Sequence, residues 1–135
     1  MDTEISLAIR AAHRSSSNRF RIGASARRKD GAIVAAHNAT DRIPYPRGHA
    51  EIRLARKLDV GSVVIVVRVR RDGRLAMAKP CQNCLRSLLS VGVAEIYYSN
   101  HDGEIVKLSL REECYPCVPR YASSQRQASR SAYCL

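Results

Sequence analysis

The chain has 135 residues, of which 45% are hydrophobic, enough for one domain with a buried core but too few for two. No apolar stretch approaches the ~20 residues that span a bilayer, and the acidic Asp2 and Glu4 replace the basic start of a signal peptide, so we expect a cytoplasmic protein without membrane contact. Lys and Arg outnumber Asp and Glu by 23 to 12, a net charge of +11 that attracts nucleotide phosphates or nucleic acid, or serves only solubility.

The first third of the chain predicts a helix followed by a β-hairpin. Apolar residues recur at near-helical spacing over about residues 3–15, and a run of polar serines ends this helix. Apolar and polar residues then alternate over 20–26. The turn Asp30-Gly31 separates that run from residues 32–36, which predicts the hairpin.

The middle of the chain predicts two helices around a buried strand. A loop rich in helix-breaking residues, 37–47, leads to a second helix that opens at Gly48-His49. The continuous β-branched run 63–67 is typical of a central strand that is buried on both faces. A third helix is expected from Cys81 to about Val91, directly after Pro80.

Two strands complete the predicted domain. Residues 94–99 form one strand, and a strong turn precedes a last strand at 104–108, which we expect to return antiparallel to it. The order α-β-β-α-β-α-β-β predicts an α/β fold, a mixed sheet with helices on both faces. We assign residues 1–117 to this single domain and 118–135, rich in Ser and Arg, to a basic, flexible tail.

Two short motifs carry the chemistry of the sequence. His49-Ala50-Glu51 and Pro80-Cys81-Gln82-Asn83-Cys84 offer one imidazole, two thiols and one further acid. Three such ligands leave the fourth position of a tetrahedral Zn²⁺ open, as catalytic sites require. Taken alone, each half is weak, since the histidine can be a core or surface residue and the cysteines a redox pair or half of a structural zinc site.

Local geometry favours the catalytic interpretation. Both cysteines fall in the first turn of one predicted helix, three residues apart on one face, where the helix dipole favours thiolate. His49 and Glu51 lie at the start of another predicted helix. The combination of H-x-E with P-C-x-x-C, in which the Glu is not a ligand, is the signature of zinc-dependent deaminases of nucleobases.

With these residues placed, the chain resembles the cytidine deaminase superfamily over about residues 3–110. The resemblance implies a three-layer α-β-α sandwich with a mixed five-stranded sheet, one catalytic Zn²⁺, and assembly as a homo-oligomer. It implies zinc ligation by His49, Cys81 and Cys84, and proton transfer by Glu51 to and from the reacting water and base. Asn38 matches the substrate-contacting Asn of the family, or is only a turn residue.

The substrate is less narrowly defined. By the resemblance Tyr98 walls the base pocket, unless it only packs the core, and Ala50 of the H-A-E motif contacts the substrate. The residues after Asn38 offer no acid to grip sugar hydroxyls, which weakens the nucleoside interpretation. Arg47, or other arginines such as those at 42, 68, 70 and 71, can hold a 5′-phosphate or a strand backbone.

Three functions therefore stay open. The first is a deaminase of a free cytosine nucleotide or nucleoside. The second is a deaminase of cytosine, less favourably adenine, in single-stranded DNA or RNA, although six Tyr, one Phe and no Trp leave little material for stacking. The third is a catalytically silent zinc domain that binds nucleic acid. A second C-x-x-C, Cys114 to Cys117, is interpreted as a pair of ordinary thiols.

Overall fold

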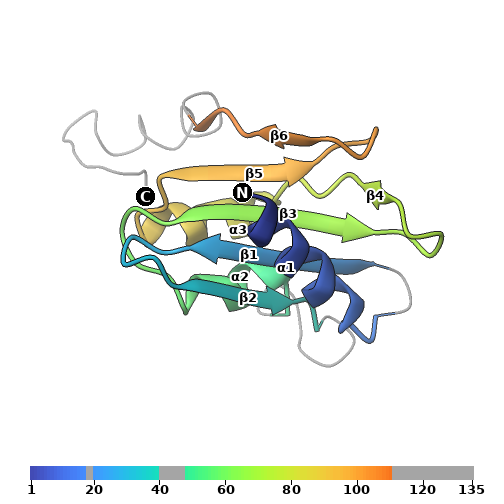
Figure 1. Cartoon of the computed structure of the whole chain (residues 1–135). Coiled ribbons are helices and arrows are strands. Elements are labelled where there is room, and N and C mark those ends of the chain that lie inside the picture. The colour runs from blue at the N-terminus through green and yellow to red at the C-terminus, as the bar shows by residue number, and fades with distance from the viewer. Residues whose placement is uncertain (18–19, 40–47, 111–135) are drawn as a thin grey trace.

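The computed structural model describes residues 1–17, 20–39 and 48–110 (Figure 1). Its elements follow the predicted order, with one additional short strand. They are α1 (Asp2–His13), β1 (Arg21–Arg27), β2 (Ile33–His37), α2 (Ala50–Ala55), β3 (Val63–Val69), β4 (Leu75–Ala76), α3 (Gln82–Ser90), β5 (Glu95–Ser99) and β6 (Ile105–Lys107). The tail 118–135 and Cys114 to Cys117 lie outside the described residues, so the assignments made for them stay predictions.

The strands form one mixed sheet, as predicted. Its order is β2-β1-β3-β5-β6, with β1 antiparallel to both neighbours and β3 parallel to β5. The last pair, β5 and β6, is antiparallel, which confirms the expected return. The sequence did not predict β4, a sixth strand of two residues that pairs with the end of β3, because two residues are too few to show an alternating pattern.

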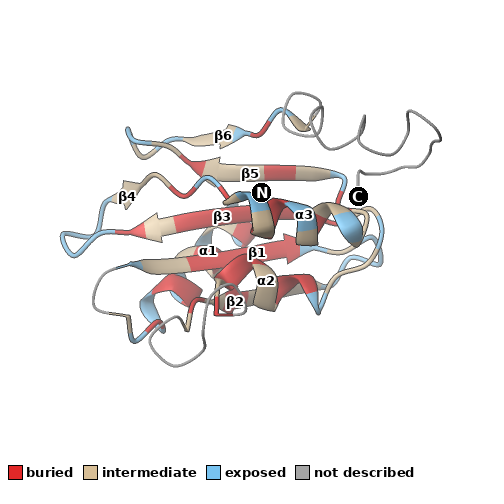
Figure 2. Ribbon diagram, turned by 180° about the vertical axis from the view of Figure 1, so that it is seen from behind, coloured by how far each residue is buried: buried red, intermediate tan, exposed pale blue. Residues whose placement is uncertain are grey.

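Helices cover both faces of the sheet. In Figure 1, α1 lies in front of the strands, and in the reverse view of Figure 2, α2 and α3 lie in front. The central strand β3 serves both layers: Ile65, Val67 and Val69 pack with α1, while Val64 and Val66 belong to the core under α2 and α3. Because successive strand residues point to opposite faces, burial of both sets explains the continuous β-branched run. The expected three-layer sandwich is confirmed.

The part of the chain that the structure describes contains no helix long and apolar enough to cross a membrane.

Gly23 in β1 allows α1 to approach the sheet closely. A Cβ atom at this position would meet the carbonyl oxygen of Ala8 and lie 2.5 Å from the backbone nitrogen of Ala12, and backbone atoms cannot turn aside as a side chain can. We therefore expect Gly23→Ala to displace α1 and lower the free energy of unfolding by about 3 kcal/mol. Urea denaturation of both proteins measures this difference.

A glycine without such contacts provides the control. A methyl group at Gly31 would have no heavy atom within 4 Å, but the φ of 92° at this residue disfavours a side chain. We expect Gly31→Ala to cost only about 1 kcal/mol. If both substitutions lowered the free energy of unfolding equally, close packing of α1 on β1 would not be the reason that position 23 needs glycine.

Candidate metal centre and active site

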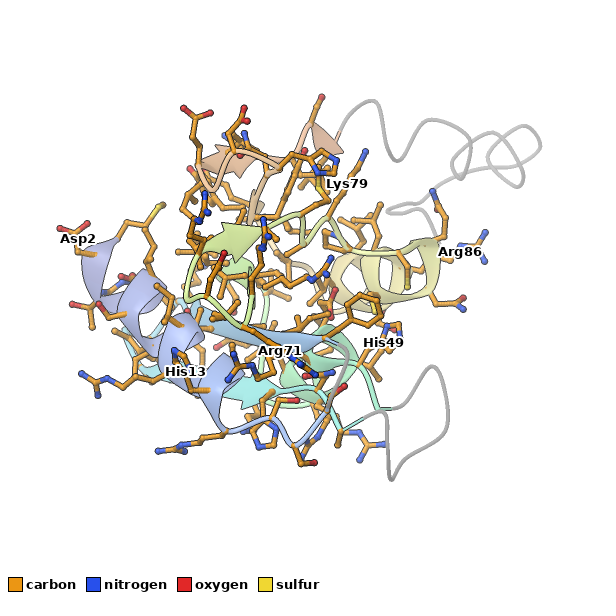
Figure 3. All side chains as sticks on the ribbon, turned by 90° about the vertical axis from the view of Figure 1, so that its right-hand side faces the viewer. Asp2, His13, His49, Arg71, Lys79 and Arg86 are labelled. Carbon is orange, nitrogen blue, oxygen red and sulfur yellow. The ribbon has the colours of Figure 1, made fainter. Side chains whose placement is uncertain are left out.

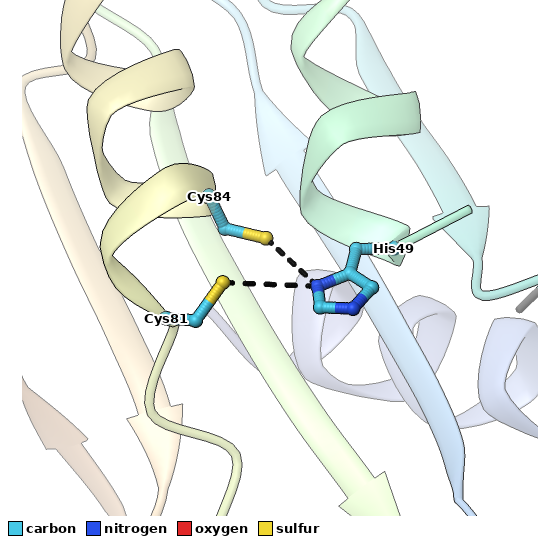
Figure 4. A group of neighbouring side chains, drawn as sticks. All are labelled: His49, Cys81 and Cys84. Atoms are coloured by element: carbon cyan, nitrogen blue, oxygen red, sulfur yellow. Dashed lines mark hydrogen bonds between the residues drawn. The ribbon is translucent and has the colours of Figure 1, made fainter. Parts of the chain in front are cut away.

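Two helix starts bring the motif residues together. His49 is the N-cap of α2 and Cys81 the N-cap of α3, while Cys84 lies in the first turn of α3. Both caps have extended backbone, with ψ of 144° at His49 and 171° at Cys81, so each motif marks the point where a loop turns into a helix. The two helices lie on the same face of the sheet, and their first turns face each other (Figure 4).

The side chains of His49, Cys81 and Cys84 form a compact group of potential metal ligands. Their ligand atoms all lie within 4.8 Å of one another. His49 Nδ1 lies 3.2 Å from Cys84 Sγ and 3.8 Å from Cys81 Sγ (Figure 4). Tetrahedral zinc with ordinary Zn–N and Zn–S bond lengths separates nitrogen from sulfur by about 3.5 Å, so these spacings suit one shared ion.

Glu51 is the acid of the site and is almost fully buried, with 5% of its surface exposed. Burial raises its pKa to about 7, although hydrogen bonds from its own backbone and from Cys84 act in the opposite direction. Desolvation also raises the pKa of the Cys84 thiol, and the neighbouring Glu51 and Cys81 add to that effect. Burial lowers the pKa of His49. A bound cation would stabilise the Cys84 thiolate, and the neutral imidazole favoured at His49 is the form that ligates metal, so the residues fit a metal site.

A cavity of about 320 Å³ opens beside these residues. It is lined by Phe20, Ile22, Asn38, His49, Glu51, Arg68, Met77, Ala78, Lys79 and Cys81. The acid and two of the three candidate ligands therefore face one space of the size that small-molecule sites have. The sequence had no signal for the apolar lining residues: strand ends and the segment before Pro80 meet here only through folding.

Asn38 is buried, with 2% of its surface exposed, and lines this cavity at the end of β2. Its Oδ1 accepts a hydrogen bond from Ile22 N at 3.0 Å, and its Nδ2 donates one to Phe20 O at 2.8 Å. These two hydrogen bonds fix the backbone at residues 20–22, where β1 begins and the chain lines the cavity. Asn38 consequently has a structural task here, whether or not it also contacts a substrate.

We expect Asn38→Ala to lower the free energy of unfolding by about 2 kcal/mol, because the Ile22 N–H and the Phe20 C=O both lose a buried partner. Asn38→Asp keeps the acceptor for Ile22 but buries a carboxylate and sets one of its oxygens against the Phe20 carbonyl, so we expect a loss at least as large. Chemical denaturation of the three proteins measures the order. Unchanged stability in both variants would leave substrate contact as the explanation for this residue.

Other predicted contacts lie elsewhere. Ala50 is fully buried in the core cluster under α2 and α3, and Tyr98 packs against the same cluster from β5. Neither belongs to the cavity lining found among the described residues. Arg47 lies outside the described part of the chain, as does Arg42. The substrate contacts predicted for Ala50, Tyr98 and Arg47 therefore stay predictions.

Fold and site together define an α/β sandwich domain with a His, Cys, Cys metal-binding group at two helix starts and a buried acid beside it. Its fold is that of the cytidine deaminases. The structure of cytidine deaminase from Burkholderia pseudomallei matches with a TM-score of 0.62 at 20% identity, over 83% of this chain and 94% of that one. This agreement confirms the fold that the sequence motifs predicted.

Two further solved structures support the same fold. A mutant cytidine deaminase from Mycobacterium tuberculosis matches with a TM-score of 0.55 at 23% identity, over 78% of this chain and 88% of that one. Cytidine deaminase from Mycobacterium leprae matches with a TM-score of 0.53 at 22% identity, over 78% of this chain and 91% of that one. No protein-family model matches the sequence, and no curated protein does.

Proposed function

We propose that this protein is a hydrolytic deaminase that converts cytosine to uracil in a free cytidine or deoxycytidine nucleotide or nucleoside. The observation that carries the proposal is the position of Glu51, a buried acid in the same cavity as His49 and Cys81. A purely structural metal site has no use for such an acid. The shared fold with cytidine deaminases supports the choice of base.

His49, Cys81 and Cys84 would hold one Zn²⁺. One imidazole nitrogen and two sulfurs are the donors zinc prefers, and their spacing in the structure suits tetrahedral bond lengths. Held by these three residues, a Zn²⁺ ion would supply a nucleophilic water at neutral pH. The burial of Glu51 and the walls of the cavity then determine how this water would react.

Glu51 is the proton carrier in this proposal. Its carboxylate takes one proton as a water oxygen adds to C4 of cytosine, and it delivers that proton to the ring nitrogen. It then takes the second proton from the hydroxyl group now on C4 and delivers it to the departing amine. The C4–N bond breaks, ammonia leaves, and the oxygen stays as the carbonyl of uracil, so water is the only co-reactant. A carboxyl whose pKa lies near 7 both accepts and donates protons readily at neutral pH.

The cavity walls suit a planar base. Ile22, Met77 and Ala78 supply apolar contacts, and the ring of Phe20 lies at the cavity with 44% of the residue exposed. Bases bind well between such apolar and aromatic side chains. The polar groups that line the same cavity can then orient the base by hydrogen bonds.

Base conversion is tested directly by incubating zinc-loaded protein with a substrate panel and following mass changes by mass spectrometry. The panel holds cytidine, deoxycytidine, their phosphates, the adenosine counterparts and single-stranded oligonucleotides. Conversion of free cytosine compounds supports the proposal. Conversion of oligonucleotides alone would replace it by the nucleic-acid deaminase, and no conversion at all would leave a silent zinc domain.

Three wider expectations remain part of the proposal: one catalytic domain over residues 1–117, a cytoplasmic location and a homo-oligomeric assembly. The reducing environment of the cytoplasm would keep Cys81 and Cys84 as thiols ready for metal. Light scattering coupled to gel filtration measures the assembly state.

A further inference from the structure

A second and larger hollow, of about 800 Å³, lies beside the candidate active site. Four arginines line it, Arg21, Arg68, Arg70 and Arg71, and we call it the arginine groove. Resting on the function proposed above, we propose that the arginine groove binds the 5′-phosphate of the substrate. The protein would then act on cytosine nucleoside monophosphates in preference to nucleosides.

The fold gathers these arginines at one end of the sheet. Arg21 opens β1 and pairs in register with Val69 near the end of β3, while Arg70 and Arg71 follow in the turn toward β4. Ser15, Ser16 and Ser17, which follow α1, also line the groove, although the Ser15 hydroxyl donates its hydrogen bond to the carbonyl of Asn38. Figure 3 looks onto this end of the molecule, where Arg71 and His49 are labelled. Arginines and hydroxyl groups together are typical donors to phosphate oxygens.

Arg68 connects the two hollows, because it lines both the arginine groove and the cavity with His49 and Glu51. Its guanidinium carbon lies 4.5 Å from the centre of the Phe20 ring, a cation–π contact that fixes the side chain between the two spaces. A ligand with its base beside Glu51 and an anionic group beyond Arg68 would therefore occupy both hollows at once. A nucleotide has that arrangement of a planar base at one end and an anionic group at the other.

Charge within the groove favours an anion. Among the described residues, four guanidinium groups line it against one carboxylate, Asp72, which lies 3.8 Å from Arg70 and 3.3 Å from Arg74. Arg21 also donates a hydrogen bond to the carbonyl of Arg70 at 3.2 Å, so it uses one of its five N–H donors. Guanidinium groups held close together repel one another, and a bound phosphate would offset that repulsion.

Asp72 also argues for a single phosphate rather than a nucleic-acid backbone. The backbone N–H of Arg74 donates a 3.0 Å hydrogen bond to Asp72 Oδ1, which holds the carboxylate in the groove wall. The pKa of Asp72 is lowered first by that backbone hydrogen bond and further by the charges of Arg70 and Arg74, so the carboxylate stays ionised. Successive phosphates of a strand would have to pass this negative charge, whereas one terminal phosphate need not.

Kinetics on matched substrates test the proposal. We expect the zinc-loaded protein to have a kcat/KM for deoxycytidine 5′-monophosphate at least about tenfold above that for deoxycytidine, since an Arg–phosphate contact is a strong charged hydrogen bond. Arg21→Gln and Arg71→Gln should each lower this ratio several-fold or more. Arg86→Gln removes the same charge from the exposed surface of α3, outside the groove, and should leave the ratio unchanged.

Binding of inorganic phosphate, measured by calorimetry on the same proteins, gives a readout that needs no turnover. We expect weaker phosphate binding in Arg21→Gln and Arg71→Gln but not in Arg86→Gln. Equal kcat/KM for nucleotide and nucleoside would overturn the proposal. So would phosphate binding that is unchanged in Arg21→Gln and Arg71→Gln. Conversion of oligonucleotides without conversion of monophosphates would overturn it too. Groove-dependent phosphate binding in a protein that converts no substrate would instead support the phosphate site and refute the deaminase function.

Discussion

Turnover is expected to fall by at least about a thousandfold in Glu51→Gln, while the metal stays bound. Glutamine preserves the size of the side chain and can still form hydrogen bonds, but it cannot accept or deliver a proton at neutral pH. Since Glu51 is buried beside His49 and is not among the three grouped ligands, its replacement leaves the donor set of the metal intact. Measured kcat and zinc content, the latter by mass spectrometry of the metal, report the two effects separately.

Glu95→Gln is the matched control for this experiment. Glu95 lies on β5, where it pairs with Lys107 at 3.2 Å, and it does not line the cavity. We expect that variant to keep the activity and the metal. Activity retained in Glu51→Gln would contradict the proposed mechanism, and loss of zinc in that variant would mean that Glu51 takes part in metal binding.

The second large effect is expected on removal of the metal. Cys84→Ala deletes a buried candidate ligand, so under the proposed function we expect the zinc content to fall from about one ion per chain to nearly none, with loss of activity. A metal that binds only the folded state stabilises it by about 4 kcal/mol at a thousandfold excess over the dissociation constant. Chelation should therefore lower the Tm of the unmodified protein by several degrees and leave the Tm of Cys84→Ala nearly unchanged.

Thermal denaturation with and without chelator measures this difference, and Ser87→Ala on the same helix serves as the control. Ser87 lies one turn beyond Cys84 in α3, and its side chain is not part of the metal-binding group. That variant should respond to chelator as the unmodified protein does. A Cys84→Ala protein that still binds one zinc, or whose Tm still falls on chelation, would exclude the proposed ligand set.

Local sequence patterns were sufficient to predict the main helices and strands and to place the two motifs at helix starts. Helical periodicity and Pro80 predicted where α3 begins, and Asp30-Gly31 marked the turn between β1 and β2. The apolar run at 63–67 identified the strand buried on both faces. Such features depend on backbone preferences and on side-chain period within a few residues, which is why a single chain reveals them. The positions of His49, Glu51, Cys81 and Cys84 at helix starts follow from the same signals.

Tertiary structure alone decided what surrounds those residues. The 3.2 Å approach of His49 to Cys84 depends on how α2 and α3 pack on one sheet face, and the position of Arg68 between two hollows depends on the register of β1 with β3. Asn38 accepts a hydrogen bond from the backbone of Ile22 in β1, Ala50 is buried in the core, and Tyr98 packs against that core. These are contacts between residues far apart in the chain, determined by the burial of whole faces, and no local pattern encodes them.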